Sequence, residues 1–219
     1  LMVLPLWLIV SVSLTDAQAL TLAGYRLIPA EFSFKAYDYI FRAPRELARS
    51  YGVTTFVTLS GTTIGMLIMS ALAYGMSRVQ GTGRKLVNGY VLFTVLFSGG
   101  VIPFYLVMTR MYQLKDSVIA LIFPYLVGPF NVLLLRSYFT QLPQEILEAA
   151  KIDGASEWRI FFQIAIPLST PALATIGLFT ALGYWNDYWM ALLFISRSDY
   201  IPLQYLLFNI LNNVEVLSR

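Results

Sequence analysis

The feature that most constrains this 219-residue chain is a series of long segments without Asp, Glu, Lys or Arg. A helix that crosses a membrane needs roughly 20 predominantly apolar residues, and a charge within it is costly. Five segments reach or approach this length and predict membrane spans, whereas a sixth, residues 200–214, is short and partly polar. The predicted spans are Leu1–Thr15, Ser50–Ser77, Leu86–Thr109, Ser117–Leu135 and Ile160–Asn186.

Composition supports lipid as the solvent of this chain. Hydrophobic residues make up 58%, charged residues only 12%, and the mean hydropathy is +0.67, values too apolar for a soluble domain of this length. The chain has no cysteine and no histidine, which excludes thiolate and imidazole nucleophiles and the common zinc sites. We therefore predict no catalytic residue and no metal site. The scattered basic residues also indicate no nucleic-acid partner.

The polar loops give a weak indication of orientation. The short loop Arg78–Lys85 is dense in basic residues, which favours the cytoplasmic side, but the count over all loops leaves the topology nearly undecided. On this reading Arg136–Arg159 shares the cytoplasmic face, while Asp16–Arg49 and Arg197–Arg219 face outward. Within the second span, Gly61 and Gly65 form a small-xxx-small pattern, which we attribute to ordinary packing inside one bundle rather than to a dimer interface.

The most informative segment lies between Pro143 and Pro167, before the last predicted span. Its pattern predicts two short helices joined by a turn at Gly154, with Asp153 as the N-cap of the second helix. An apolar stripe should lie on that second helix, formed by Trp158, Phe161, Phe162 and Ala165. Two prolines, Pro167 and Pro171, should then break the helix and restart it as the next span, with Thr170 as a cap.

This segment resembles the EAA loop of ABC importer permeases. The match consists of Glu148-Ala149-Ala150, Gly154 after three further residues, and Ile164-Ala165-Ile166-Pro167 after nine more. The only departure is Ile166, where leucine is usual. The flanking Asp153, Ala155, Trp158 and Phe161 are similar to the carbohydrate-transport branch. Two further segments, 97–103 and 183–186, are similar to the subfamily that takes up oligosaccharides.

The resemblance implies an all-α, polytopic transmembrane helical bundle of the ABC importer permease type, located in the bacterial plasma (inner) membrane. Residues 1–219 are expected to form a single permease domain with a cytoplasmic coupling loop at about 140–167. The family has six core spans, so a sixth span is expected after Arg219, and further residues are expected before Leu1. The residues expected to couple to the ATPase are Glu148, Ala149, Ala150, Asp153, Gly154, Ala155 and Pro167.

The same resemblance implies partners rather than cofactors. They are a second permease subunit, a dimer of ATPase subunits, an extracytoplasmic solute-binding protein, a saccharide substrate and membrane lipid. The chain has no Gly-xxxx-Gly-Lys-Ser/Thr phosphate loop, so another polypeptide must bind ATP. We thus predict a transport subunit and not an enzyme.

Aromatic and amide side chains suggest where a saccharide could pass, because aromatic rings stack on sugars and amides bond hydroxyls. The candidates are Tyr125, Asn131, Tyr184, Trp185 and Asn186. The alternative is a belt of aromatic residues at the membrane surface. A permease for a non-sugar solute also stays open. An ion-coupled secondary transporter is less favoured, because the long predicted spans have no charged residue in their middles.

Overall fold

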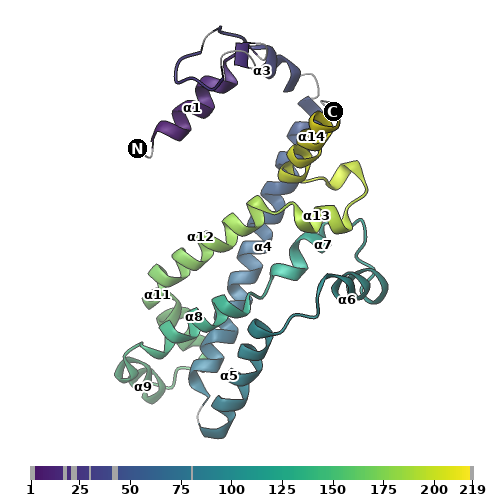
Figure 1. Ribbon diagram of the computed structural model, residues 1–219. Helices are drawn as coiled ribbons and strands as arrows, with labels where there is room; N and C mark the ends of the chain where they lie inside the picture. Colours follow the sequence, from purple (N-terminus) through teal and green to yellow (C-terminus); the bar gives the residue numbers. More distant parts are fainter. Residues whose placement is uncertain are drawn as a thin grey trace. The chain divides into compact units, whose positions relative to one another are not determined.

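A computed structural model describes residues 3–16, 19–20, 24–29, 31–40, 44–79 and 81–217. The regular elements in these ranges are helices, as the sequence predicts (Figure 1). The chain forms two compact units, Leu1–Arg49 and Ser50–Arg219. Each unit is described by itself.

The first unit contains α1 (Val3–Ser13) and α3 (Lys35–Ile40). The two helices are joined by a hydrogen bond between the hydroxyl groups of Ser13 and Tyr37, 2.9 Å apart. Apolar side chains cover most of α1 and are exposed within this unit, which suits contact with lipid or with another protein.

The second unit is a helical bundle arranged along one long helix, α4 (Pro44–Arg78), of which the part from Ser50 belongs to this unit. Short 3₁₀ and π segments interrupt several of the other helices. In chain order these elements are α5 (Gly81–Leu96), α6 (Val101–Leu106), a π-helix (Val107–Met111), α7 (Ile119–Ile122), a 3₁₀-helix (Phe123–Tyr125), α8 (Pro129–Thr140), α9 (Gln144–Ile152), α10 (Glu157–Ile160), a second π-helix (Phe161–Ala165), α11 (Ile166–Leu168), α12 (Thr170–Asn186), α13 (Trp189–Phe194), a 3₁₀-helix (Ser198–Tyr200) and α14 (Leu203–Leu217).

Only α4 is a single helix long and apolar enough to cross a membrane among the described residues. Three bent pairs of helices raise the number of candidate spans to four if each pair forms one span. Their bends measure 105° between Gly83–Leu96 and Val101–Met111, 48° between Ile119–Tyr125 and Pro129–Thr140, and 81° between Glu157–Leu168 and Thr170–Asn186.

The predicted span Leu86–Thr109 is therefore not a continuous helix. Residues 97–100 are non-helical between α5 and α6, and Gly100 has a φ of +83°. This left-handed conformation is open to glycine at little cost and ends the regular hydrogen-bond pattern. The absence of charged residues predicted a span here, but it gives no information about whether the backbone is one continuous helix.

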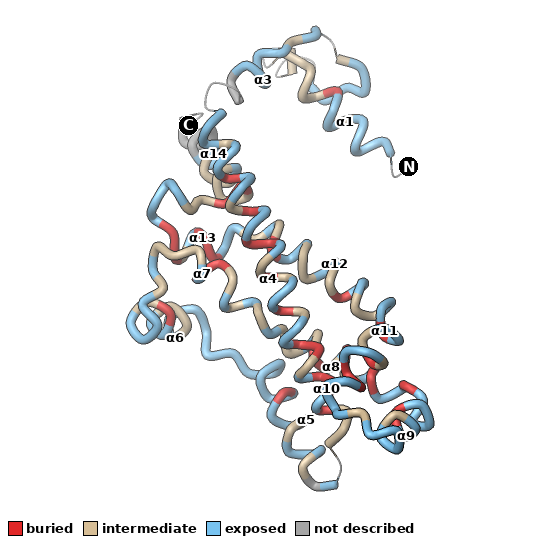
Figure 2. Tube along the Cα trace, turned by 180° about the vertical axis from the view of Figure 1, so that it is seen from behind, coloured by how far each residue is buried: buried red, intermediate tan, exposed pale blue. Residues whose placement is uncertain are grey.

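Two hydrophobic clusters pack along α4 (Figure 2). One contains Met69 and Ala73 of α4 with side chains of α8, α9 and the α10 region, and the other contains Val57 with side chains of α7, α12 and α13. Between them, a Cβ at Gly61 would lie 2.5 Å from Cζ of Tyr184, and one at Gly65 would lie 3.1 Å from the carbonyl oxygen of Leu126. The two glycines thus serve packing inside this chain, as predicted.

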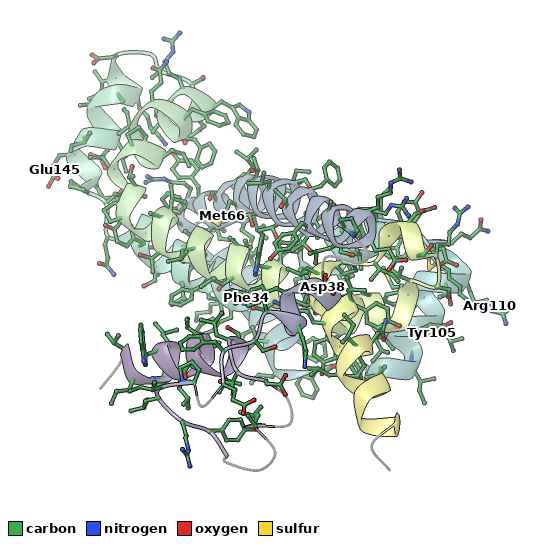
Figure 3. The ribbon with its side chains drawn as sticks, turned by 90° about the horizontal axis from the view of Figure 1, so that it is seen from above. Phe34, Asp38, Met66, Tyr105, Arg110 and Glu145 are labelled. Carbon is green, nitrogen blue, oxygen red and sulfur yellow. The ribbon has the colours of Figure 1, made fainter. Side chains whose placement is uncertain are left out.

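The loops of the second unit gather at two opposite ends. Figure 3 shows Glu145 of α9 at one end and Tyr105 and Arg110 at the other, with Met66 of α4 between them. The loop after α4 and the segment around α9 meet at the first end, as the topology prediction requires. At the second end, the Asp116 carboxylate accepts hydrogen bonds from the amide groups of Ser196 and Arg197.

Candidate functional site

The first part of the candidate site is α9 and the turn that ends it. Asp153 is the C-cap of α9 and Gly154 follows with a φ of +78°. The Ala155 amide donates to the carbonyl of Ala150 at 2.9 Å, and the Gly154 amide donates to that of Lys151 at 3.0 Å. These two bonds define a Schellman motif, whose left-handed residue is usually glycine. The predicted turn at Gly154 is thereby confirmed.

The Schellman motif explains the spacing of the EAA signature physically. It brings the residue three positions before the cap, Ala150, next to the residue two positions after it, Ala155, and an apolar contact between these positions is typical. Both alanines pack against the buried cluster around Phe139 and Leu147. Of the residues predicted to couple to the ATPase, those that remain exposed are Glu148, Ala149, Asp153, Gly154 and Pro167.

The N-cap prediction for the next helix was wrong. Ser156, not Asp153, caps α10: its backbone is extended, with ψ of 156°, and its Oγ accepts a hydrogen bond from the Arg159 amide at 3.3 Å. The Schellman turn causes this difference. Because Gly154 closes α9, Asp153 retains near-helical backbone angles and belongs to the preceding helix.

The predicted apolar stripe is only half buried. Phe161 and Ala165 lie in the core, whereas Trp158 is 67% exposed and Phe162 is 53% exposed. Residues Phe161–Ala165 form a π-helix, which has more residues per turn than the α-helix assumed in the prediction. The exposed aromatic side chains form an apolar surface beside the turn at Gly154.

The chain then bends by 81° between α11 and α12. Pro167 lies in α11 and Pro171 in the first turn of α12, as the prediction of a proline-broken helix requires. The predicted cap, Thr170, instead lies inside α12. Its Oγ1 donates to the carbonyl of Pro167 at 2.7 Å, and Ser169 occupies the N-cap position.

The second part of the candidate site is a cavity of about 420 Å³ beside α8 and α12. Three of the five predicted path residues line it: Tyr125, Asn131 and Tyr184. The rings of the two tyrosines lie edge to face, 5.8 Å apart. The Tyr125 hydroxyl donates to Oδ1 of Asp187 at 3.0 Å. Aromatic and amide groups are therefore together at this place, as saccharide contact would require.

Tyr184 also holds the bundle together. Its ring lies against Gly61, its side chain is 4% exposed, and its hydroxyl donates to the carbonyl of Ile122 at 2.9 Å. A buried hydrogen bond of this kind contributes about 1 kcal/mol, and an unpaired partner costs more. The tyrosine thus has a packing role in addition to lining the cavity.

Trp185 and Asn186 do not lie among the described residues that line this cavity. The Asn186 amide instead donates to the carbonyl of Leu182 at 2.9 Å, one turn earlier. The sequence reasoning missed Thr180, which lines the cavity four residues before Tyr184. Helical periodicity could have found it, because residues four apart share one face of a helix.

Comparisons with known proteins agree with this architecture. The family model "Binding-protein-dependent transport system inner membrane component" matches residues 61–216. The protein LplC of Bacillus subtilis (strain 168) is 42% identical over 94% of this chain and 69% of its own length. The polygalacturonan/rhamnogalacturonan transport system permease protein YtcP of the same strain is 42% identical over 94% of this chain and 71% of its own length.

A solved structure is similar as well. It is a bacterial ABC transporter involved in the import of the acidic polysaccharide alginate, with a TM-score of 0.85 and 31% identity over 94% of this chain and 73% of the other. Family membership implies an ATPase, a solute-binding protein and a second permease as partners. The chain belongs to the family of binding-protein-dependent transport system inner membrane components, and it is the permease subunit of an ABC importer rather than an enzyme.

Proposed function

We propose that this permease conducts oligosaccharides through the cavity beside α8 and α12. The observation that carries the proposal is the lining itself, which combines the rings of Tyr125 and Phe179 with the amide of Asn131 and the hydroxyl of Thr180. Thr180 Oγ1 donates to the carbonyl of Ile176 at 2.8 Å, which leaves its lone pairs for a sugar hydroxyl. The names of YtcP and of the alginate importer support a saccharide substrate.

No residue described as lining the cavity is charged. On this side of the pathway, substrate contact therefore rests on ring stacking and hydrogen bonds to hydroxyl groups rather than on charge. Such contacts are individually weak, which suits an importer because it must release what it binds.

Two matched variants test the cavity. Asn131→Leu and Thr180→Val should each raise the saccharide concentration for half-maximal uptake by about fivefold, which corresponds to roughly 1 kcal/mol. Thr175→Val is the control, because Thr175 makes the same bond to the carbonyl four residues earlier and lies outside the described cavity lining. Unchanged uptake in both test variants, with the complex assembled, would exclude this cavity as the pathway.

The same proposal assigns ATPase docking to α9 and the Gly154 turn. The exposed acidic residue Glu148 beside Ala149 offers a small, acid-bordered surface that fits a basic-rimmed cleft. Glu148→Arg should abolish co-purification of the ATPase subunit. Glu31→Arg, the same charge reversal at an exposed position of the first unit, should leave it intact. Equal ATPase recovery with both variants would exclude docking at this surface.

We further propose a multi-pass topology in which the end with α9 is cytoplasmic. Because the chain has no cysteine, Lys85→Cys and Lys115→Cys provide a clean pair at opposite ends of the bundle. An impermeant thiol reagent applied outside should label position 115 and not position 85. Labelling of position 85 and not of position 115 would show that the chain has the opposite orientation in the membrane.

A further inference from the structure

The start of α9 is bonded directly to the last turn of α4, and its end is connected to α4 through Glu157 of α10. At the start of α9, Gln144 Oε1 accepts a hydrogen bond from Nη1 of Arg78 at 3.1 Å. Just beyond its other end, Glu157 accepts a hydrogen bond from the Tyr74 hydroxyl at 3.0 Å and pairs with Lys151 of α9. Tyr74 and Arg78 are one turn apart on α4, so neighbouring side chains of that helix reach α9 directly at Gln144 and through Glu157 at Lys151.

The α4 side of these two polar links is rigid. The Arg78 guanidinium stacks over the Tyr74 ring, with Cζ 5.0 Å from its centroid. The ring itself is buried and packs against Phe139 at 5.8 Å and Phe161 at 5.1 Å. A tyrosine packed against these groups resists a change of rotamer, so we expect a displacement of Glu157 to be felt by α4.

These polar links between α4 and the α9 segment are expected to contribute little to the free energy of folding. The side chains of Lys151 and Glu157 are 49% and 54% exposed, and ion pairs this exposed contribute little to folding. Nε and Nη2 of Arg78 are buried without a hydrogen-bond partner among the described residues, which is unfavourable.

A movement of α4 would reach the cavity. Tyr74 lies 13 residues after Gly61, about 20 Å along the helix at 1.5 Å per residue. Gly61 touches the ring of Tyr184, which lines the cavity. Because the backbone at Gly61 is in contact with this ring, we expect a shift of α4 to be felt at Tyr184.

We propose that α4 receives the movement of α9 directly, through Tyr74–Glu157–Lys151 and Arg78–Gln144, and passes it to the cavity at Tyr184. Tyr74 and Glu157 are then positioning residues for the coupling of ATP hydrolysis to transport. This inference rests on the proposed docking of the ATPase at α9. It adds a second route besides the covalent connections of α9 to α8 and, through α10 and α11, to α12.

The test removes the hydroxyl group of Tyr74, which donates the hydrogen bond to Glu157. In the complete importer complex, Tyr74→Phe keeps the ring packing and should lower the stimulation of ATP hydrolysis by loaded binding protein about tenfold, the effect of losing one hydrogen bond to a charged group. Tyr90→Phe, at an exposed position on α5, is the matched control and should retain full stimulation. Basal ATP hydrolysis and co-purification of the ATPase should be normal in both.

A double-mutant cycle separates a link from independent packing effects. Glu157→Gln should reduce stimulation as well, and the Tyr74→Phe/Glu157→Gln double variant should be no worse than the poorer single variant. Full stimulation in Tyr74→Phe, or independent multiplication of the two losses, would overturn the inference. Failure of ATPase docking in Glu148→Arg tests the proposed function separately, since that residue takes no part in the two links.

Discussion

Substitutions at Gly154 can separate two roles of the turn that ends α9: its backbone conformation and its proposed docking to the ATPase. A Cβ at this position would meet no atom of the described residues within 4 Å, but the backbone has a φ of +78°. Substitution therefore costs conformational energy without a clash inside the permease. Any larger side chain points into open space, where only a partner could be affected.

The magnitude follows from the backbone alone. Placing a residue other than glycine in the left-handed region costs about 1–2 kcal/mol, and the stiffer unfolded chain offsets about 0.4–1 kcal/mol of this. The net loss of roughly 1 kcal/mol corresponds to about fivefold more frequent opening of the turn. Gly154→Ala and Gly154→Trp should show the same loss, and Gly154→Asn a smaller one, because asparagine tolerates this conformation.

Amide hydrogen exchange measures the stability of the turn, and co-purification of the ATPase measures its proposed docking. After correction for intrinsic rates, the amides of residues 154 and 155, which form the Schellman bonds, should exchange about fivefold faster in both the Ala and the Trp variants. Co-purification of the ATPase should persist with Ala and fail with Trp. The control Gly89→Ala, at an open helical position, should be neutral or slightly stabilising.

Two results would refute this reasoning. Unchanged exchange at residues 154 and 155 in Gly154→Ala would show that the left-handed turn is not a constraint on this segment. Equal ATPase binding by the Ala and Trp variants would show that no partner approaches Gly154, and the docking assignment would have to be abandoned.

Three further outcomes are expected. Gly61→Ala should lower the free energy of unfolding of the purified complex by about 1–3 kcal/mol, because the added Cβ would overlap the ring of Tyr184. Gly52→Ala, at an open site on the same helix, should leave it unchanged. Equal melting temperatures of the two variants would contradict the close packing at Gly61. Tyr184→Phe should destabilise the complex by about 1 kcal/mol through loss of the bond to Ile122, and a wild-type melting curve would count against that bond. The hydrogen bond from the Ser196 amide, followed by that from the Arg197 amide, lowers the pKa of Asp116, so the ionised carboxylate stabilises the fold above its unfolded pKa of about 4. This stabilisation is lost as the pH falls through the lower pKa of the folded state. Asp116→Asn should therefore make the melting temperature less dependent on pH on the acid side, and an unaltered dependence would refute the assignment.

Local sequence signals predicted those features that local physics determines. The turn at Gly154 needs a residue that tolerates positive φ, and the proline pair around residue 169 must interrupt hydrogen bonding, so both were visible in the sequence. Asp153 was misassigned because aspartate suits an N-cap in isolation, and only the closure of α9 by the Schellman motif decides that Ser156 takes this role.

The cavity was less predictable because α12 is apolar on all sides, and no polar stripe reveals which face lies inward. Its rotation is set by contacts with other elements, among them the ring of Tyr184 against Gly61 and the hydrogen bond from Tyr184 to the carbonyl of Ile122. These contacts bring Thr180 to the cavity, whereas Asn186 donates to the carbonyl of Leu182 and accepts a hydrogen bond from Gln204. Composition offered five aromatic and amide residues as candidates, and only the packing of α12 decides that Tyr125, Asn131 and Tyr184 line one cavity while Trp185 and Asn186 do not.

The two clusters along α4 suggest why one long helix is needed between shorter, bent ones. Each cluster fixes a different part of α4, through Val57 near one end and through Met69 and Ala73 near the other. Bent pairs can change their angle at their breaks, but an unbroken helix transmits displacement along its axis. Gly61 lets the backbone of α4 touch the ring of Tyr184 directly, so on the proposed route a shift at the α9 end is felt at that ring. The proposed coupling therefore depends on close packing along α4 as much as on the α9 segment itself.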